Sequence, residues 1–162
     1  MGRAFVFGDG ISTDVLAPGR MMKRPVPEIA TACLEAVNPT FASTVRPGDV
    51  VVAGRAFGVG SSREQAVEAL RCLGVSAVLA VSFGRIFYRN AINLGLPVLL
   101  FPHTGEISPG DLLDVDAATG DVTNLTSGAR YSVSPLPKNL LSIIADGGLT
   151  PHLKRRFTKV GA

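Results

Sequence analysis

The stretch Asp49–Glu64 reads DVVVAGRAFGVGSSRE and decides the surrounding fold, because it leads the chain from a buried strand into a helix. Its first residues, Asp49–Ala53, form a short apolar run that predicts a strand covered on both faces. The glycine-rich segment 54–60 predicts a loop with little side-chain bulk. Alanine and leucine then recur at helical spacing as far as Leu73, and Gly74 predicts the end of that helix.

Two serines and an arginine follow the glycine-rich loop. Ser61 and Ser62 are expected at the helix N-terminus, where free backbone N–H groups and the helix dipole favour an anion. Arg63 adds a guanidinium that can bind a carboxylate through two hydrogen bonds. The pattern from Ser61 to Glu64 is also that of an ordinary capping box. A cap requires neither the flanking glycines nor the second serine, so we expect a turn that holds a carboxylate.

Other glycine-rich motifs do not fit this stretch. A dinucleotide-binding fingerprint and a nucleophile elbow would both need a glycine where Arg63 stands, and a phosphate-binding loop would end in Gly-Lys-Ser/Thr. The two histidines of the chain, His103 and His152, offer little to a serine hydrolase triad. The sequence therefore argues against nucleotide binding and against serine hydrolysis.

The rest of the chain predicts one α/β domain over residues 1–162. Apolar runs alternate with helical patterns in its middle part, which predicts a βαβαβ unit with parallel strands. The last third predicts paired strands and a closing helix, and no linker separates it from the middle. The expected strands are 3–7, 49–53, 76–81, 97–101, 112–115, 121–125 and 131–133; the expected helices are 27–37, the one after the serines, 84–94 and about 138–146, with a loop at 8–24.

Composition excludes several function classes. The chain has 162 residues, 46% of them hydrophobic, which is enough for a sizeable core. It contains no apolar run long enough to span a membrane and no signal-peptide pattern, so we expect a cytoplasmic protein without membrane contact. Its net charge is +3 and its basic residues are dispersed, apart from a cluster at Lys154–Arg156 that is typical of a solvated helix end. Nucleic-acid binding is therefore not expected.

Cysteines and arginines bear on metal and anion chemistry. Cys33 and Cys72 are too few for a closed zinc site or a four-iron cluster, and Cys33 is interpreted as a core residue, so no metal is expected on this chain. Arg85 and Arg89 are four residues apart and share a helix face with Asn93. That face is either ordinary solvated surface or a surface that supports the carboxylate turn or a partner.

Three sequence blocks together resemble the small subunits of 3-isopropylmalate dehydratases, in the aconitase superfamily. The blocks are Phe7–Asp14 (FGDGISTD), Gly58–Glu64 (GVGSSRE) and Ser82–Asn90 (SFGRIFYRN), and the similarity extends over most of residues 3–145. The resemblance implies a swivelling β/β/α domain of the aconitase C-terminal type, which closes over an active site.

The resemblance also implies a partner. In this family a separate large subunit carries a [4Fe-4S] cluster, and the two subunits form a heterodimer or heterotetramer that is active only when assembled. The implied activity is that of a hydro-lyase that interconverts 2-isopropylmalate and 3-isopropylmalate by dehydration and rehydration, in leucine biosynthesis. The substrate is a small hydroxy-dicarboxylic acid, and this chain binds no cofactor itself.

The resemblance assigns roles to residues, although spacing alone cannot say which of the two serines is the base. Ser61 matches the catalytic base, and Ser62 with Arg63 matches the group that holds a substrate carboxylate. The loop Met21, Met22, Lys23 and Arg24 matches the segment that contacts the variable substrate group; its methionines suit an apolar group and its cations suit another carboxylate. The supporting residues are Asp14, Thr13, Gly58, Gly60, Glu64 and Arg85.

This chain departs from the family pattern at three positions. Val59 replaces a common cysteine, Gln65 a usual histidine and Ser12 an aspartate. A small subunit of a homoaconitase or of a maleate- or citraconate-type hydratase is therefore an alternative. An alternative of another class is a non-catalytic, anion-binding regulatory subunit that kept the turn without turnover.

Overall fold

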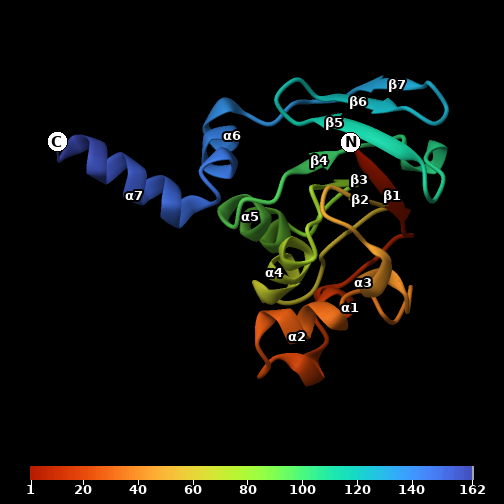
Figure 1. The fold of residues 1–162 in the computed structure, drawn as a ribbon, viewed down its shortest axis with the longest axis horizontal. Helices are drawn as coiled ribbons and strands as arrows, with labels where there is room; N and C mark the ends of the chain where they lie inside the picture. Colours follow the sequence, from red (N-terminus) through yellow and green to blue (C-terminus); the bar gives the residue numbers. More distant parts are fainter. Residues whose placement is uncertain (162) are drawn as a thin grey trace.

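The computed structural model describes residues 1–161, and its centre is a seven-stranded sheet (Figure 1). The strand order is β4-β3-β2-β1-β5-β6-β7. The strands are β1 (Gly2–Val6), β2 (Val50–Ala53), β3 (Ala77–Ala80), β4 (Val98–Leu100), β5 (Leu112–Asp116), β6 (Asp121–Asn124) and β7 (Arg130–Ser132). The α/β class and all seven expected strands are thus confirmed, with ends that differ by at most one residue.

One half of the sheet is parallel and contains the predicted βαβαβ unit. β1 pairs with β2, β2 with β3 and β3 with β4, all in parallel. Helix α4 (Gln65–Cys72) connects β2 to β3, and helix α5 (Arg85–Asn93) connects β3 to β4. Every residue of β2 and β3 is buried, because helices cover the parallel strands and leave them no solvated face.

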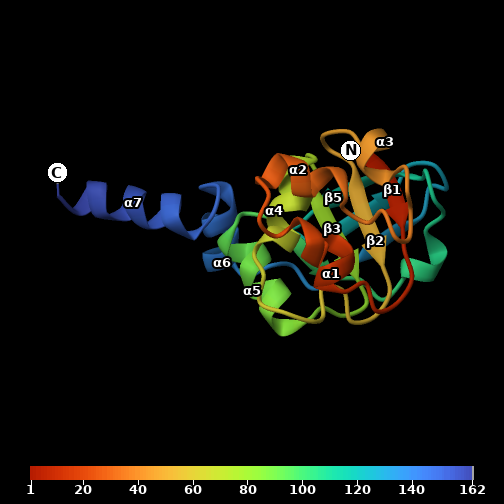
Figure 2. The ribbon, with the colours of Figure 1, turned by 90° about the horizontal axis from the view of Figure 1, so that it is seen from below.

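The other half of the sheet is antiparallel and leads into the C-terminal helices. β5 pairs with β1 and β6, and β6 pairs with β7, all in antiparallel fashion. The expected final helix is α6 (Lys138–Ala145). A further helix, α7 (Leu149–Val160), was not predicted; it extends away from the body of the molecule (Figures 1 and 2) and carries the exposed cluster Lys154–Arg156.

The N-terminal region departs from the prediction in two ways. The expected loop 8–24 contains the short helix α1 (Thr13–Leu16) and a 3-10 turn, Gly19–Met21. The helix expected over 27–37 is only α2 (Val26–Thr31), because Leu34 adopts a left-handed conformation with φ 61° that a helix cannot contain. Ile29 and Cys33 are buried as expected, whereas Val37 is exposed.

Two short helical segments complete the described chain. Helix α3 (Phe41–Thr44) precedes β2, and a second 3-10 turn, Thr104–Glu106, follows β4. Figure 2 shows α1, α2 and α4 together on one side of the sheet. The buried side chain of Phe41, from α3, packs edge-on against Phe5 and Phe7 of the N-terminal segment.

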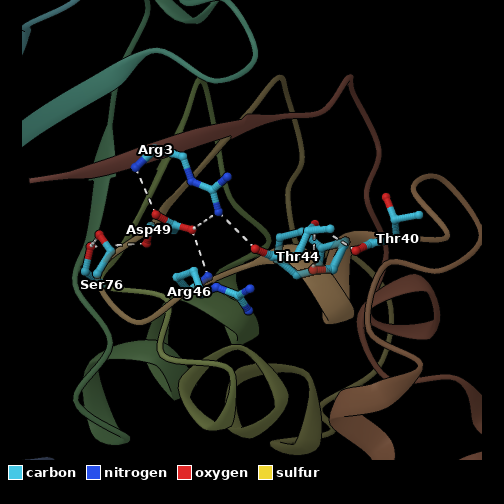
Figure 3. A network of polar contacts seen from close by, with 8 residues as sticks. Arg3, Thr40, Thr44, Arg46, Asp49 and Ser76 are labelled. Atoms are coloured by element: carbon cyan, nitrogen blue, oxygen red, sulfur yellow. Dashed lines mark hydrogen bonds and ion pairs between the residues drawn. The ribbon is translucent and has the colours of Figure 1, made fainter.

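A buried carboxylate, Asp49, joins the start of β1 to the start of β2 (Figure 3). Asp49 accepts hydrogen bonds from the backbone N–H groups of Arg3 (2.9 Å) and Arg46 (2.8 Å). Arg3 Nη2 also lies 3.1 Å from Asp49 Oδ2 and donates to the carbonyl of Thr44 over 2.9 Å. These hydrogen bonds therefore take the place of the water molecules that the carboxylate loses on burial.

Candidate active site at the serine turn

The turn that carries the serines lies beside the segment that begins α1. Gly58 N–H donates to the Ile11 carbonyl (2.6 Å), and Thr13 N–H donates to the Val59 carbonyl (2.8 Å). Ser12 and Val59 form an isolated parallel bridge. Two of the three sequence blocks, distant along the chain, are thus held together by backbone hydrogen bonds.

The glycines of the turn allow close approach of side chains from α1 and α5. Gly58 has φ +80°, and a Cβ atom there would lie 2.2 Å from Cγ of Phe87. Gly60 has φ +125°, and a Cβ atom there would lie 2.7 Å from Thr13 Oγ1. Both positions therefore exclude a side chain by conformation and by space.

The serines do not lie at the helix N-terminus, which corrects one expectation. Helix α4 begins at Gln65, its N-cap is Glu64, and no side chain caps it. The capping box from Ser61 to Glu64 is therefore absent. The physical reason is that the Ser61 backbone and side chain are bound to Thr13 and Arg63, which keeps residues 61–63 out of the first helical turn.

Several polar groups lie within hydrogen-bond distance of Ser61 Oγ. Arg63 Nε donates to it over 2.7 Å, and the Arg63 backbone N–H donates over 3.4 Å. Thr13 Oγ1 lies 3.3 Å from Ser61 Oγ and also accepts the Ser61 backbone N–H over 3.1 Å. Ser61 is exposed to solvent whereas Thr13 is buried, so the hydroxyl is supported from the protein side and open on the other.

The Arg63 guanidinium is held in place by helix α1 and the residue after it. Arg63 Nη1 donates to Asp14 Oδ1 over 3.3 Å and to the Ala17 carbonyl over 2.9 Å. Asp14 Oδ1 in turn accepts the Gly19 backbone N–H over 2.9 Å. Within residues 1–161, Nη2 of Arg63 makes no hydrogen bond, so this edge remains available to a ligand.

Arg85 and Ser62 border the same region. Arg85 lines a hollow of about 240 Å³ together with Ser61, both turn glycines and the first residues of α5. Ser62 is exposed, and its carbonyl accepts a hydrogen bond from Asn90 Nδ2 of α5 over 3.1 Å. The third sequence block therefore forms the opposite wall of this hollow.

Arg85 also borders a larger groove of about 540 Å³ between α5 and α6. Arg85, Arg89 and Asn93 all line this groove, so the predicted common face of the three residues is confirmed. Tyr88 lines the same groove, and burial raises the pKa of its phenol. Ser61 and Ser62 do not line it.

The loop Met21–Arg24 combines buried and exposed side chains. Met21 and Met22 are half-buried and pack against the core, whereas Lys23 and Arg24 are exposed. Arg24 lies 3.6 Å from Glu28 in an ion pair. None of these four residues lines the hollow beside Ser61.

The described residues hold no evident metal ligand set. No group of three or more His, Cys, Asp or Glu side chains within residues 1–161 is placed to bind a metal ion. Cys33 is buried, which raises the pKa of its thiol well above the usual range, and Cys72 is exposed. Among the same residues, no helix is long and apolar enough to cross a membrane.

Comparisons with known proteins show the family to which the chain belongs. The model of the aconitase C-terminal domain matches residues 35–104. A 3-isopropylmalate dehydratase small subunit from Archaeoglobus fulgidus is 50% identical over 157 residues, covering 96% of this chain and 94% of the relative. The methanogen homoaconitase small subunit of Methanothermobacter thermautotrophicus is 48% identical over 152 residues, covering 93% and 88%. The crystal structure of a 3-isopropylmalate dehydratase from Methanocaldococcus jannaschii has a TM-score of 0.94 at 39% identity, covering 99% of this chain and 96% of that one.

Proposed function

The chain belongs to the family of 3-isopropylmalate dehydratase small subunits, and we propose from this membership that it is half of a hydro-lyase that interconverts 2-isopropylmalate and 3-isopropylmalate. Its fold is that of the aconitase C-terminal domain. The seven strands form one sheet, which supports a single swivelling domain. In leucine biosynthesis such a subunit acts together with a large subunit.

The observation that carries this proposal is the set of donors around Ser61 Oγ. Dehydration removes a proton from the carbon beside a carboxylate and a hydroxyl from the neighbouring carbon, which leaves a C=C bond. Ser61 is the proposed base that takes this proton. A serine alkoxide is unstable in water, so it needs donors fixed around it in advance, and Arg63 Nε at 2.7 Å is one such donor.

Arg63 and Ser62 are the proposed carboxylate-binding group. Asp14 and the Ala17 carbonyl orient the guanidinium through Nη1, which leaves Nη2 for the substrate. Ser62 is exposed beside it, and Arg85 adds a second cation across the hollow. Such a site attracts a dicarboxylic acid and fixes one of its carboxylates next to the base.

The remaining part of the site belongs to the proposed large subunit. Its [4Fe-4S] cluster supplies Lewis-acid activation of the leaving hydroxyl. Cys33 is in the core and Cys72 is alone on the surface, so the cysteines of this chain do not suit a cluster. Ser61 and Ser62 are exposed in the isolated chain, which fits a site that is completed when the large subunit covers the turn.

A homoaconitase small subunit is the second candidate. The homoaconitase relative is about as similar to this chain as the 3-isopropylmalate dehydratase relative is. Lys23 and Arg24 are exposed cations that suit a third carboxylate, whereas Met21 and Met22 suit an isopropyl group. Maleate- or citraconate-type hydration and a non-catalytic regulatory role remain alternatives to be distinguished by the same experiment.

The test is reconstitution of the assembled enzyme. The chain is co-expressed with a cluster-binding large subunit, the cluster is rebuilt without oxygen, and turnover of 3-isopropylmalate, homoaconitate, maleate and citraconate is measured. We expect 3-isopropylmalate to give the highest kcat/KM and the isolated chain to be inactive. An intact, cluster-loaded complex that turns over none of these acids would overturn the enzymatic proposal in favour of the regulatory one.

A further inference from the structure

Three polar side chains are buried in the described part of the chain: Thr13, Asp49 and Asn124. Asp49 joins β1 to β2, as described above. Asn124 accepts the backbone N–H groups of Thr126 and Ser127 and donates to Asp111, so it supports the turn after β6. Thr13, 2% exposed, is the one of the three whose side chain reaches the candidate active site.

The Thr13 hydroxyl is not needed to begin helix α1. Ser12 is the N-cap of α1, and its Oγ accepts the Val15 backbone N–H over 3.2 Å. Thr13 instead turns its side chain toward the serine turn, 48 residues further along the chain. Local helix formation therefore does not explain why a hydroxyl is buried at this position.

The other hydrogen bonds of the two hydroxyls indicate which of them donates in the contact between Thr13 and Ser61. Thr13 Oγ1 already accepts the Ser61 backbone N–H over 3.1 Å. Its own hydrogen needs an acceptor because the group is buried, and the acceptor within reach among residues 1–161 is Ser61 Oγ at 3.3 Å. While Ser61 keeps its proton, either hydroxyl can donate. Once Ser61 has lost it, only Thr13 can donate.

We propose that Thr13 is a positioning residue that stabilises the deprotonated form of Ser61 by donating a hydrogen bond from Oγ1–H to Ser61 Oγ. The proposal rests on the proposed function, in which Ser61 is the base. No proton passes between the two hydroxyls: the proton on Ser61 comes from the substrate carbon, and the Thr13 O–H bond stays intact. Thr13 and Arg63 Nε together hold the alkoxide oxygen between them.

The same contact explains the demand for glycine at position 60. A Cβ atom there would lie 2.7 Å from Thr13 Oγ1, closer than any stable contact, and would displace the hydroxyl. Thr13 is also fixed by its backbone, because its N–H donates to the Val59 carbonyl. The donor is therefore held in place before any substrate arrives, which is what preorganised stabilisation of a charge requires.

The first test needs neither the large subunit nor the cluster. The chain with Ser61→Cys and Cys72→Ser carries one accessible thiol, because Cys33 is fully buried. The rate of its alkylation by iodoacetamide, measured against pH, gives the pKa of the thiol at position 61. Adding Thr13→Val is expected to raise this pKa by about 1, the effect of losing one hydrogen bond to a charged group.

Adding Thr13→Ser instead is the matched control, since it keeps the hydroxyl and removes only the methyl group. We expect it to leave the thiol pKa close to that of the parent. An unchanged pKa in Thr13→Val would overturn the proposal. If Thr13→Val does not fold, as judged by its circular dichroism, Thr13→Ala is measured and judged in the same way.

The second test uses the assembled enzyme with the natural Ser61. Thr13→Val is expected to shift the acid limb of the kcat–pH profile to higher pH and to lower kcat about tenfold at neutral pH, with little change in KM. Thr13→Ser is expected to restore both. A merely structural role would lower the amount of active enzyme without moving the pH profile. If the wild-type complex has no turnover, the proposed function fails, while the thiol titration still decides whether Thr13 supports an anion at position 61.

Discussion

Arg63 Nε donates a 2.7 Å hydrogen bond to Ser61 Oγ, two residues earlier in the chain. The sequence alone suggests a guanidinium with all of its N–H groups free to bind a carboxylate, and the structure differs from this expectation. The arginine folds back over the turn, with Nη1 on Asp14 and Ala17 and Nε on the serine. One guanidinium thus holds the proposed base and leaves its other edge for a substrate carboxylate.

Replacing either serine separates the two proposed roles. Ser61→Ala removes the proposed base, so we expect kcat of the assembled enzyme to fall by about 10²–10⁴-fold with KM little changed. Ser62→Ala removes a proposed carboxylate contact, so we expect mainly a higher KM. Steady-state kinetics with 3-isopropylmalate, on complexes with equal iron content, measures both. Near-normal kcat in Ser61→Ala would show that the base lies elsewhere.

Asp14 offers a test of how Arg63 is oriented. Its carboxylate lies 3.3 Å from Arg63 Nη1, and its side chain is 70% exposed. An ion pair this exposed contributes at most about 1 kcal/mol to stability, so Asp14→Asn should leave the melting temperature nearly unchanged. We nevertheless expect kcat/KM to fall about tenfold, because Arg63 Nη1 loses its charged partner and the guanidinium is held less firmly in the orientation that binds the substrate. Arg155→Gln breaks an ion pair of helix α7, with Asp146, in which only the arginine is exposed, and serves as the control.

The elements between Asp49 and Phe101 could be predicted because their signals are local. Strands β2 and β3 are buried apolar runs, and the glycines at positions 74 and 95 end the two helices with positive φ. The four-residue helix α1 is too short to show an apolar periodicity, although Ser12 caps its N-terminus. It forms where the backbone of residues 11–13 is hydrogen-bonded to the serine turn, a contact that no local pattern reveals.

The sequence names residues that the structure brings together at the serine turn, but it does not predict their arrangement. Ser61, Arg63, Asp14 and Thr13 are recognisable in the sequence blocks. The hydrogen bonds between Thr13 and Ser61 and between Arg63 and Asp14 join residues 48 and 49 positions apart. These tertiary contacts explain why α4 begins at Gln65 and not at the serines, against the local capping pattern.

The buried carboxylate of Asp49 should dominate the stability of the N-terminal strand. Asp49→Asn keeps the shape but removes the charge that accepts from Arg3 and Arg46, so we expect the free energy of unfolding to fall by about 3 kcal/mol. Arg3→Gln removes only the contact of a half-exposed side chain and should cost about 1 kcal/mol or less. Urea denaturation of the isolated chain compares them. Equal losses in the two variants would contradict this account.

The attachment of α7 should depend on pH through Asp146. Hydrogen bonds from His152 and Arg155 hold the pKa of the Asp146 carboxyl below its usual range. Because the folded pKa is the lower one, the stabilisation is complete above the ordinary aspartate pKa and is lost as the pH falls through the folded value. We therefore expect proteolysis at Gly147–Gly148 to accelerate below about pH 4. In Asp146→Asn the rate should be higher at neutral pH and change less on acidification.

Substrate choice should follow the loop Met21–Arg24, whose apolar and basic halves favour different acids. None of these residues lines the hollow beside Ser61, so we propose that the loop contacts the variable substrate group once the large subunit completes the site. Met21→Ser is then expected to lower kcat/KM for 3-isopropylmalate about tenfold, while Met21→Leu conserves the apolar volume and should retain it. Removing both cations, Lys23→Ala with Arg24→Ala, should lower kcat/KM for homoaconitate more than for 3-isopropylmalate, since only homoaconitate has a third carboxylate. The ratio of the two kcat/KM values, measured on one cluster-loaded preparation of each variant, is the readout. A greater loss for 3-isopropylmalate than for homoaconitate in the cation-free variant would contradict the assignment of Lys23 and Arg24 to a third carboxylate.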